Sequence, residues 1–226
     1  MRVVLLGLAL LALGWGLAAP PVPWTDGERL VYQVRWKGIP VGRQVLEARR
    51  EGALWHLVGR IEPDGVGRAL GYALKAESWA NGALYSVRFE KELVVPMQGT
   101  KRIIAVVDGA LTATVVEVSG ARYRYRSPEV NVLDDLSVLY HIRVHPETRT
   151  LQFVDFVGLI QGELEHLPVR RVAVPAGVFE ARGYRFTEGG VRVEVWFSQD
   201  AGRFPVYLVY GQGFGTVEAR LIEIRR

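Results

Sequence analysis

Side chains that can do chemistry cluster between positions 134 and 145. His141 and His145 are four residues apart, a spacing at which two imidazoles on one helix can share a metal ion. A metalloprotease helix needs a glutamate directly after the first histidine, but Ile142 stands there. We therefore expect no metal ion and no cofactor, and we expect His145 to sit at the end of a helix, beside Pro146.

The same segment carries Asp134, Ser137 and His141, which are the residue types of a hydrolase triad. On one helix these side chains would lie in a row, whereas a triad needs partners that converge from different elements. The sequence also lacks a Gly-x-Ser-x-Gly nucleophile elbow. Capping of a helix start explains Asp134 and Ser137 more simply. We therefore expect a protein that is not an enzyme, with a hydrolase as the third and least favoured alternative.

Two further sets of residues are candidates for a structural or binding role. The first is a polar cluster, in which Arg143 would pair with an aspartate across the fold (Asp135 or Asp155) and the 200–203 segment would clamp a loop. Its expected members are Asp135, Ser137, Arg143, Asp200 and Arg203. The second set is aromatic and either fills the core or lines an apolar ligand cavity, which small inward residues such as Gly59 would widen. The aromatic residues expected at such a cavity are Tyr32, Trp36, Trp55, Tyr72 and Trp196.

The elements that must position these residues are mostly strands, because apolar and polar residues alternate with a period of two. Asn81-Gly82 and Asp108-Gly109 predict tight hairpins in which both central residues have positive φ. Strands are expected near 28–37, 41–50, 54–61, 72–80, 83–91, 100–107, 110–118, 121–126, 150–156, 163–174, 178–186, 191–198, 204–210 and 214–225.

One helix is expected between the two series of strands, over 133–144, with Asn131 near its start and Pro146 after its end. Many strands with short turns and no βαβ alternation predict a mainly β fold. We expect a large curled antiparallel sheet, a half-barrel around this internal helix. A closed lipocalin-like barrel is the alternative. No low-complexity linker divides residues 19–226, which are expected to form a single domain.

The first 18 residues have the order of a cleavable signal peptide. Arg2 precedes an apolar run from Val3 to Leu13, and small residues follow, with Gly16-x-Ala18 as the best cleavage match. The alternative is an uncleaved membrane anchor, but Pro20 and Pro21 would end its helix early. The chain has no cysteine, so lipid attachment at the junction is excluded. We expect an exported protein of the bacterial periplasm or cell envelope.

The segment 121–126 alternates three arginines with two tyrosines. Such a stripe can bind anionic headgroups, glycans or nucleic acid, or it can protect an edge strand from aggregation. An exported protein rarely meets nucleic acid, and the formal net charge is only +4. We favour the edge strand and expect no nucleic-acid partner.

Several short motifs, taken in order, resemble an uncharacterised family of bacterial exported proteins, domain of unknown function 3108. The motifs are Gly27-Glu28-x-Leu30-x-Tyr32, Gly38-Ile39-Pro40-Val41-Gly42, Asp135-Leu136-Ser137-Val138-Leu139-Tyr140 with Arg143, Val174-Pro175-Ala176-Gly177-Val178-Phe179, Val195-Trp196-Phe197-Ser198 with Asp200, Arg203, Pro205 and Val206, and Gly215-x-Val217-x-Ala219-x-Leu221. The resemblance implies an envelope protein with no established reaction or cofactor. The C-terminal half is also distantly similar to lipoprotein-carrier half-barrels, which hold acyl chains in their concavity.

Together these observations predict a non-catalytic protein that binds or carries a lipid or another apolar molecule in the concave face of its sheet. The alternative is a structural or interaction protein of the envelope, with a filled core and no small-molecule ligand. Envelope proteins are possible partners in either case, and the chain is anchored to the membrane only if the signal stays uncleaved.

Overall fold

The computed structural model describes residues 21–95, 97–188, 191–212 and 215–226. The predicted signal peptide at 1–18 lies outside them. Within the described chain, no helix is both long and apolar enough to cross a bilayer. The chain folds into one 16-stranded sheet with the order β8-β7-β6-β5-β4-β3-β2-β1-β16-β15-β14-β13-β11-β10-β9, and β12 pairs with β13 beside this path.

The first eight strands along the chain are β1 (Glu28–Trp36), β2 (Ile39–Glu51), β3 (Leu54–Pro63), β4 (Ala73–Ala80), β5 (Ser86–Val95), β6 (Gly99–Val107), β7 (Leu111–Val116) and β8 (Arg122–Ser127). The remaining strands are β9 (Leu133–Asp134), β10 (Thr150–Asp155), β11 (Gly158–His166), β12 (Arg170–Val174), β13 (Gly177–Glu188), β14 (Val191–Ser198), β15 (Pro205–Gln212) and β16 (Gly215–Arg225).

The described residues also form two helices, α1 (Gly65–Leu70) and α2 (Ser137–Val144). The predicted helix over 133–144 begins later than expected, because Leu133 and Asp134 form the short strand β9, which pairs in parallel with β10. Helix α1 has no counterpart among the predicted elements. It is short and ends at Gly71, whose φ of 71° lies in the left-handed region that favours glycine.

Two sequence predictions about the sheet need correction. The expected strand over 163–174 is two strands, since residues between His166 and Arg170 break the pairing and both β11 and β12 lie against β13. In the turn at Asp108-Gly109 only Gly109 has a positive φ, 65°, and the turn at Asn81-Gly82 has no positive φ at its central residues. Its left-handed residue is Leu84, with φ 70°. The side chain of Asn81 accepts hydrogen bonds from the backbone N–H groups of Ala83 and Tyr85, which holds this wider turn.

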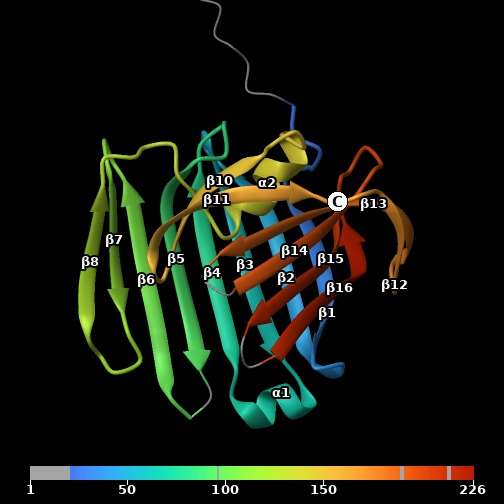
Figure 1. Ribbon diagram of the computed structural model, residues 1–226, viewed down its shortest axis with the longest axis horizontal. Coiled ribbons are helices and arrows are strands. Elements are labelled where there is room, and N and C mark those ends of the chain that lie inside the picture. Colours follow the sequence, from blue (N-terminus) through green and yellow to red (C-terminus); the bar gives the residue numbers. More distant parts are fainter. Residues whose placement is uncertain (1–20, 96, 189–190, 213–214) are drawn as a thin grey trace, which may run out of the picture.

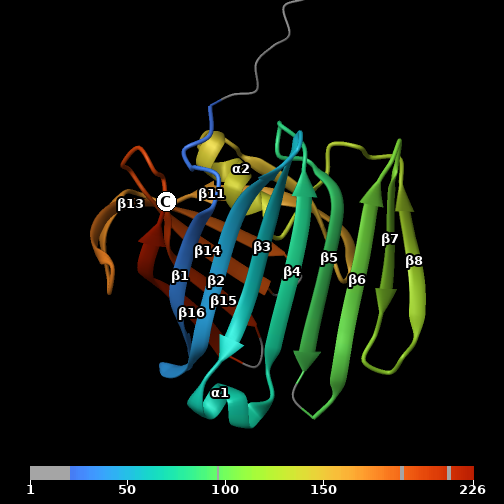
Figure 2. The same ribbon diagram turned by 180° about the vertical axis from the view of Figure 1, so that it is seen from behind.

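The sheet is curled but unclosed, so the half-barrel prediction is confirmed and the closed barrel is excluded. Its two edges are β8 and β9, which do not pair with each other. Register shifts in the pairings of β1 with β2 and of β14 with β15 mark bulges, and bulges increase strand twist. In Figure 1 the strands β13–β16 cross in front of β1–β4, and Figure 2 shows the same two layers from behind.

Helix α2 lies between these layers at one end, and α1 lies at the opposite end (Figure 1). We use the term concave face for the inner face of the sheet, which carries Leu30, Leu46 and Leu57. At the α2 end this face is completely covered, and these three side chains are at most 1% exposed. A Cβ on Gly59 would come within 2.7 Å of the Leu136 side chain, so the missing side chain makes room for Leu136 rather than for a ligand.

The edge strand β8 carries the alternating arginines and tyrosines. Arg122, Arg124 and Arg126 are exposed, as expected for a charged edge strand. On the other face of β8, Tyr123 donates a hydrogen bond to the carbonyl oxygen of Phe156 at 2.6 Å, which joins this edge to the hairpin of β10 and β11. The opening of the half-barrel is therefore bridged by a side chain and not by strand pairing.

Candidate functional site

Arg143 of α2 forms a buried ion pair with Glu28 of β1. Its two terminal nitrogens lie 2.6 and 3.1 Å from the carboxylate oxygens, and one of them also donates to the carbonyl oxygen of Gly202 at 2.9 Å. The Arg143 side chain is 1% exposed and that of Glu28 is 0% exposed. The sequence predicted that Arg143 pairs with Asp135 or Asp155. This prediction is wrong, because its partner is Glu28. Asp135 lies before the first turn of α2, and Arg143 lies in its last turn. The two residues are therefore about 12 Å apart along the helix axis.

The loop between β14 and β15 holds the C-terminal end of α2. Arg203 donates from Nη1 to the carbonyl oxygen of Arg143 at 2.8 Å, which places a positive charge where the helix dipole is negative. Asp200 accepts hydrogen bonds from the backbone N–H groups of Gly202 and Arg203 and from the hydroxyl of Ser198. Of the five residues expected in one polar cluster, Arg143, Asp200 and Arg203 thus come together here.

The other two members of that set lie at the opposite end of α2. Ser137 turns back onto Asp134, whose Oδ1 accepts the backbone N–H of Ser137 at 3.0 Å and that of Leu136 at the same distance. The Ser137 hydroxyl accepts the backbone N–H of Asp134 at 2.8 Å. His141 lies one turn further on. Burial is the main cause, and the neighbouring His145 the second, that lowers the pKa of His141 to about 4. These contacts belong to helix capping and bring no nucleophile and base together.

Asp135 belongs to a second, half-buried cluster on the concave face. Lys91 of β5 bonds Asp135, and it bonds Asp155 of β10 at 2.9 Å. Burial by itself lowers the pKa of Lys91, but the two carboxylates outweigh burial and raise it above its ordinary value. Burial and repulsion from Asp155 raise the pKa of Asp135 to about 7. One ammonium group cannot fully compensate two carboxylates, so this cluster joins β5, β10 and the start of α2 at an electrostatic cost.

Two of the predicted cavity residues fill the core at the α2 end. Tyr32 is fully buried, and Trp55 is 5% exposed. The ring of Trp24 packs edge-on against Trp55, at 5.5 Å between centroids, and against Tyr140 of α2 at 4.9 Å. These contacts occupy the space between the sheet and the helix, so Tyr32 and Trp55 serve the core.

Trp196 points to the opposite face of the sheet and does not line the concave face. Side chains alternate along β14, and its neighbours Val195 and Phe197 face inward, where Phe197 packs against Tyr184. On the outer face, Arg170 of β12 lies over the Trp196 ring at 3.7 Å. A Cβ on Gly183 would come within 2.9 Å of this ring, so the glycine permits the packing.

The concave face is less completely covered at its α1 end. The inward-facing side chains there include apolar and aromatic ones that keep part of their surface exposed, and Tyr210 is 37% exposed. The register places Trp36, Val217 and Tyr210 side by side across β1, β16 and β15. We call this region the lower concave surface and define it by Trp36, Tyr72, Leu74, Leu93, Leu208, Tyr210 and Val217. It includes the remaining two predicted cavity residues, Trp36 and Tyr72.

The sequence reasoning missed Glu28 and Lys91, although a signal for both was present. Glu28 precedes Leu30 and Tyr32 in an inward-facing alternation, and Lys91 stands between Phe89 and Leu93 in another. A charged residue at an inward strand position requires a buried partner. Within the described residues, no group of three or more His, Cys, Asp or Glu side chains is arranged to hold a metal ion.

The fold and this site define a class of protein, a β-barrel-like domain built on one large curled antiparallel sheet. Residues 31–222 match the family described as Protein of unknown function (DUF3108), and the chain belongs to that family. Its fold resembles the crystal structure of a β-barrel-like protein of domain of unknown function DUF1849 from Brucella abortus. The TM-score is 0.58 at 10% identity, over 91% of this chain and 99% of that one, so the likeness concerns the fold alone. None of the curated proteins matches.

Proposed function

We propose that this protein is an exported, non-catalytic binding protein of the bacterial cell envelope. In this proposal it holds a lipid or another apolar ligand against the lower concave surface. The observation that carries the proposal is the contrast between the two ends of the concave face. The α2 end is filled by side chains, whereas the α1 end keeps inward-facing apolar and aromatic side chains partly exposed.

An apolar ligand would gain free energy by covering these side chains, at about 25 cal/mol for each Å² of apolar surface removed from water. The proposal of export rests on the order of residues 1–18, which is that of a signal peptide. The proposal that the protein is not an enzyme rests on Asp134 and Ser137, whose hydrogen bonds are used to begin α2.

The test uses the full chain, expressed with its own signal and purified from the periplasm. Native mass spectrometry detects a co-purifying lipid, and the intact mass reports cleavage after Ala18. Fluorescence titration with N-phenyl-1-naphthylamine, a neutral apolar probe, then compares Val217→Glu with Thr216→Glu. Val217 faces inward and Thr216 is exposed on the other face of the same strand. We expect Val217→Glu to abolish probe binding and Thr216→Glu to preserve it.

The alternative is a structural or interaction protein with a filled core. It is favoured by the complete packing around α2 and by the exposed edge strand β8. If no lipid co-purifies and the wild-type protein binds no probe, the apolar-ligand proposal is wrong and this alternative takes its place. Equal probe binding by both variants would also reject the lower concave surface as the site.

A further inference from the structure

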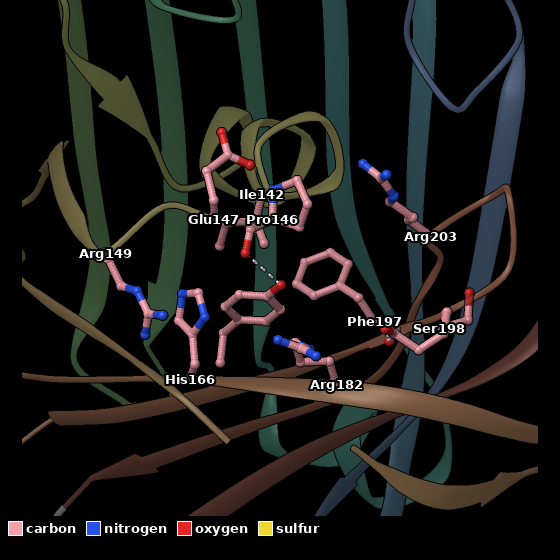
Figure 3. A pocket seen from close by; sticks show the side chains of 11 residues that line it. Ile142, Pro146, Glu147, Arg149, His166, Arg182, Phe197, Ser198 and Arg203 are labelled. Carbon is pink, nitrogen blue, oxygen red and sulfur yellow. Dashed lines mark hydrogen bonds between the residues drawn. The ribbon is translucent and has the colours of Figure 1, made fainter. Parts of the chain in front are cut away.

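A pocket with a volume of about 460 Å³ opens beside the C-terminal end of α2, remote from the lower concave surface. Four separate parts of the chain supply its walls: α2 with the segment after it, the end of β11, β13, and β14 with the loop that follows it. Figure 3 shows the side chains that line it. They include Glu147, Arg149, His166, Arg182, Tyr184 and Arg203.

The lining of this pocket is strongly basic. Arg182, Arg203, Glu147 and Arg149 all lie within electrostatic reach of the Tyr184 hydroxyl, so three positive charges stand against one negative charge there. Across the described residues, the side chains of Arg149 and Arg182 form no ion pair with a carboxylate, and both residues are exposed. In Figure 3 these two side chains lie on either side of His166. Two guanidinium groups therefore keep all their donors available at one place.

The acidic member of the lining does not neutralise this charge. The Glu147 side chain is 75% exposed, and its carboxylate lies 3.4 Å from Nδ1 of His145, outside the pocket lining. Figure 3 shows the Glu147 carboxylate directed away from His166 and Arg182. The pocket therefore keeps an excess of positive charge.

The carbonyl oxygens at the end of a helix would normally repel an anion. At the end of α2, the carbonyl oxygen of Arg143 accepts from Arg203 at 2.8 Å. In the segment after the helix, the carbonyl oxygen of Pro146 accepts from the Tyr184 hydroxyl at 2.9 Å, and that of Thr148 bonds Nε2 of His166 at 2.6 Å. These bonds also fix the orientation of the Tyr184 and His166 rings. The positive charge of Arg203 therefore offsets the negative end of the helix dipole at this position.

We propose that this pocket binds a phosphate group, either as free phosphate or a small phosphate ester or as the headgroup of a phospholipid. Guanidinium groups match phosphate oxygens in charge and geometry and often bind them through two parallel hydrogen bonds. Arg149 and Arg182 supply those donors from two sides. The Tyr184 hydroxyl donates to Pro146, so its oxygen remains able to accept a hydrogen bond from an ester hydroxyl.

Calorimetric titration of the full chain with inorganic phosphate and with glycerol 3-phosphate tests the soluble source. Co-sedimentation with phosphatidylglycerol vesicles, against vesicles of phosphatidylcholine alone, tests the headgroup source. The test variant is Arg149→Gln/Arg182→Gln. The matched control is Arg124→Gln/Arg126→Gln, which removes the same charge from exposed positions on β8. Neither pair of side chains has a hydrogen-bond partner in the described chain, so we expect both variants to fold.

We expect the test variant to weaken binding in at least one arm by about tenfold or more, and we expect the control to leave it nearly unchanged. Binding in the soluble arm assigns the pocket to free phosphate or a small ester, and binding only to anionic vesicles assigns it to a headgroup. The proposal is overturned if nothing binds in either arm, or if the control weakens binding as much as the test variant. N-phenyl-1-naphthylamine carries no charge, so failure of the apolar site would not alter this result.

Discussion

Glu28→Gln removes the negative charge that faces Arg143 while keeping the size of the side chain. The guanidinium group remains 1% exposed and cannot give up its proton. Its hydrogen bond to the carbonyl oxygen of Gly202 persists, but a neutral amide then stands where two carboxylate oxygens had accepted bonds at 2.6 and 3.1 Å. Breaking a buried ion pair from one side costs about 3–5 kcal/mol. For a domain of this size, the cost corresponds to a melting temperature lower by roughly 6–20 °C.

Urea unfolding followed by circular dichroism at pH 7 measures this loss. The control is Glu90→Gln on β5, because Glu90 pairs with Arg88 at 2.6 Å on the exposed face and such pairs contribute about 1 kcal/mol or less. The double variant Glu28→Leu/Arg143→Met should unfold close to the wild type, since it removes both charges and leaves apolar side chains of similar size. The reasoning is refuted if Glu28→Gln loses no more stability than Glu90→Gln. It is also refuted if the double variant is as unstable as Glu28→Gln.

Three further changes probe the packing and the titrating groups of the core. Gly59→Val should displace Leu136 from the sheet, because even a Cβ would come within 2.7 Å of it, and should lower the melting temperature by several degrees; an unchanged melting curve would contradict the packing of α2. The pKa of His141 is about 4 in the folded protein and about 6.5 when unfolded, so unfolding takes up a proton and stability should fall as pH drops from about 6.5 to 4. Urea unfolding of His141→Gln over this range should show a weaker loss than the wild type. The pKa of Asp135 is instead raised to about 7, so its contribution has the opposite sign and is lost as pH rises from about 4 to 7. Asp135→Asn should remove that loss while Lys91 stays paired with Asp155, and an unaltered pH profile would refute the assignment.

Much of the fold follows from local pattern. The alternation in Leu30, Tyr32 and Val34 places these residues on one face of a strand whatever their neighbours are, because successive side chains of a strand point to opposite sides. The turns at Gly52 and Gly109 could be located for the same kind of reason, since each needs a residue with positive φ. The curled antiparallel sheet with one internal helix was therefore predictable from sequence.

Local pattern did not reveal which residues meet across the fold. Trp196 and Val195 are adjacent and both apolar, so the sequence shows that they point to opposite faces but not which face is concave. The packing of Arg170 of β12 on the Trp196 ring places Trp196 on the outer face. The start of α2 was placed too early for a similar reason. Residues 133–134 are compatible with a helix, but pairing with β10 turns them into a strand.

The sequence by itself determined that this chain makes many antiparallel strands, has no disulfide, and begins with a segment patterned like an export signal. These properties depend on residue type and on spacings of a few residues. The tertiary structure alone decided that the sheet stays open, that α2 fills one end of the concave face, and that Arg149, His166, Arg182 and Arg203 surround one pocket. Each of these outcomes joins residues far apart in the chain, and such distances depend on the register and curvature of the whole sheet rather than on any local preference.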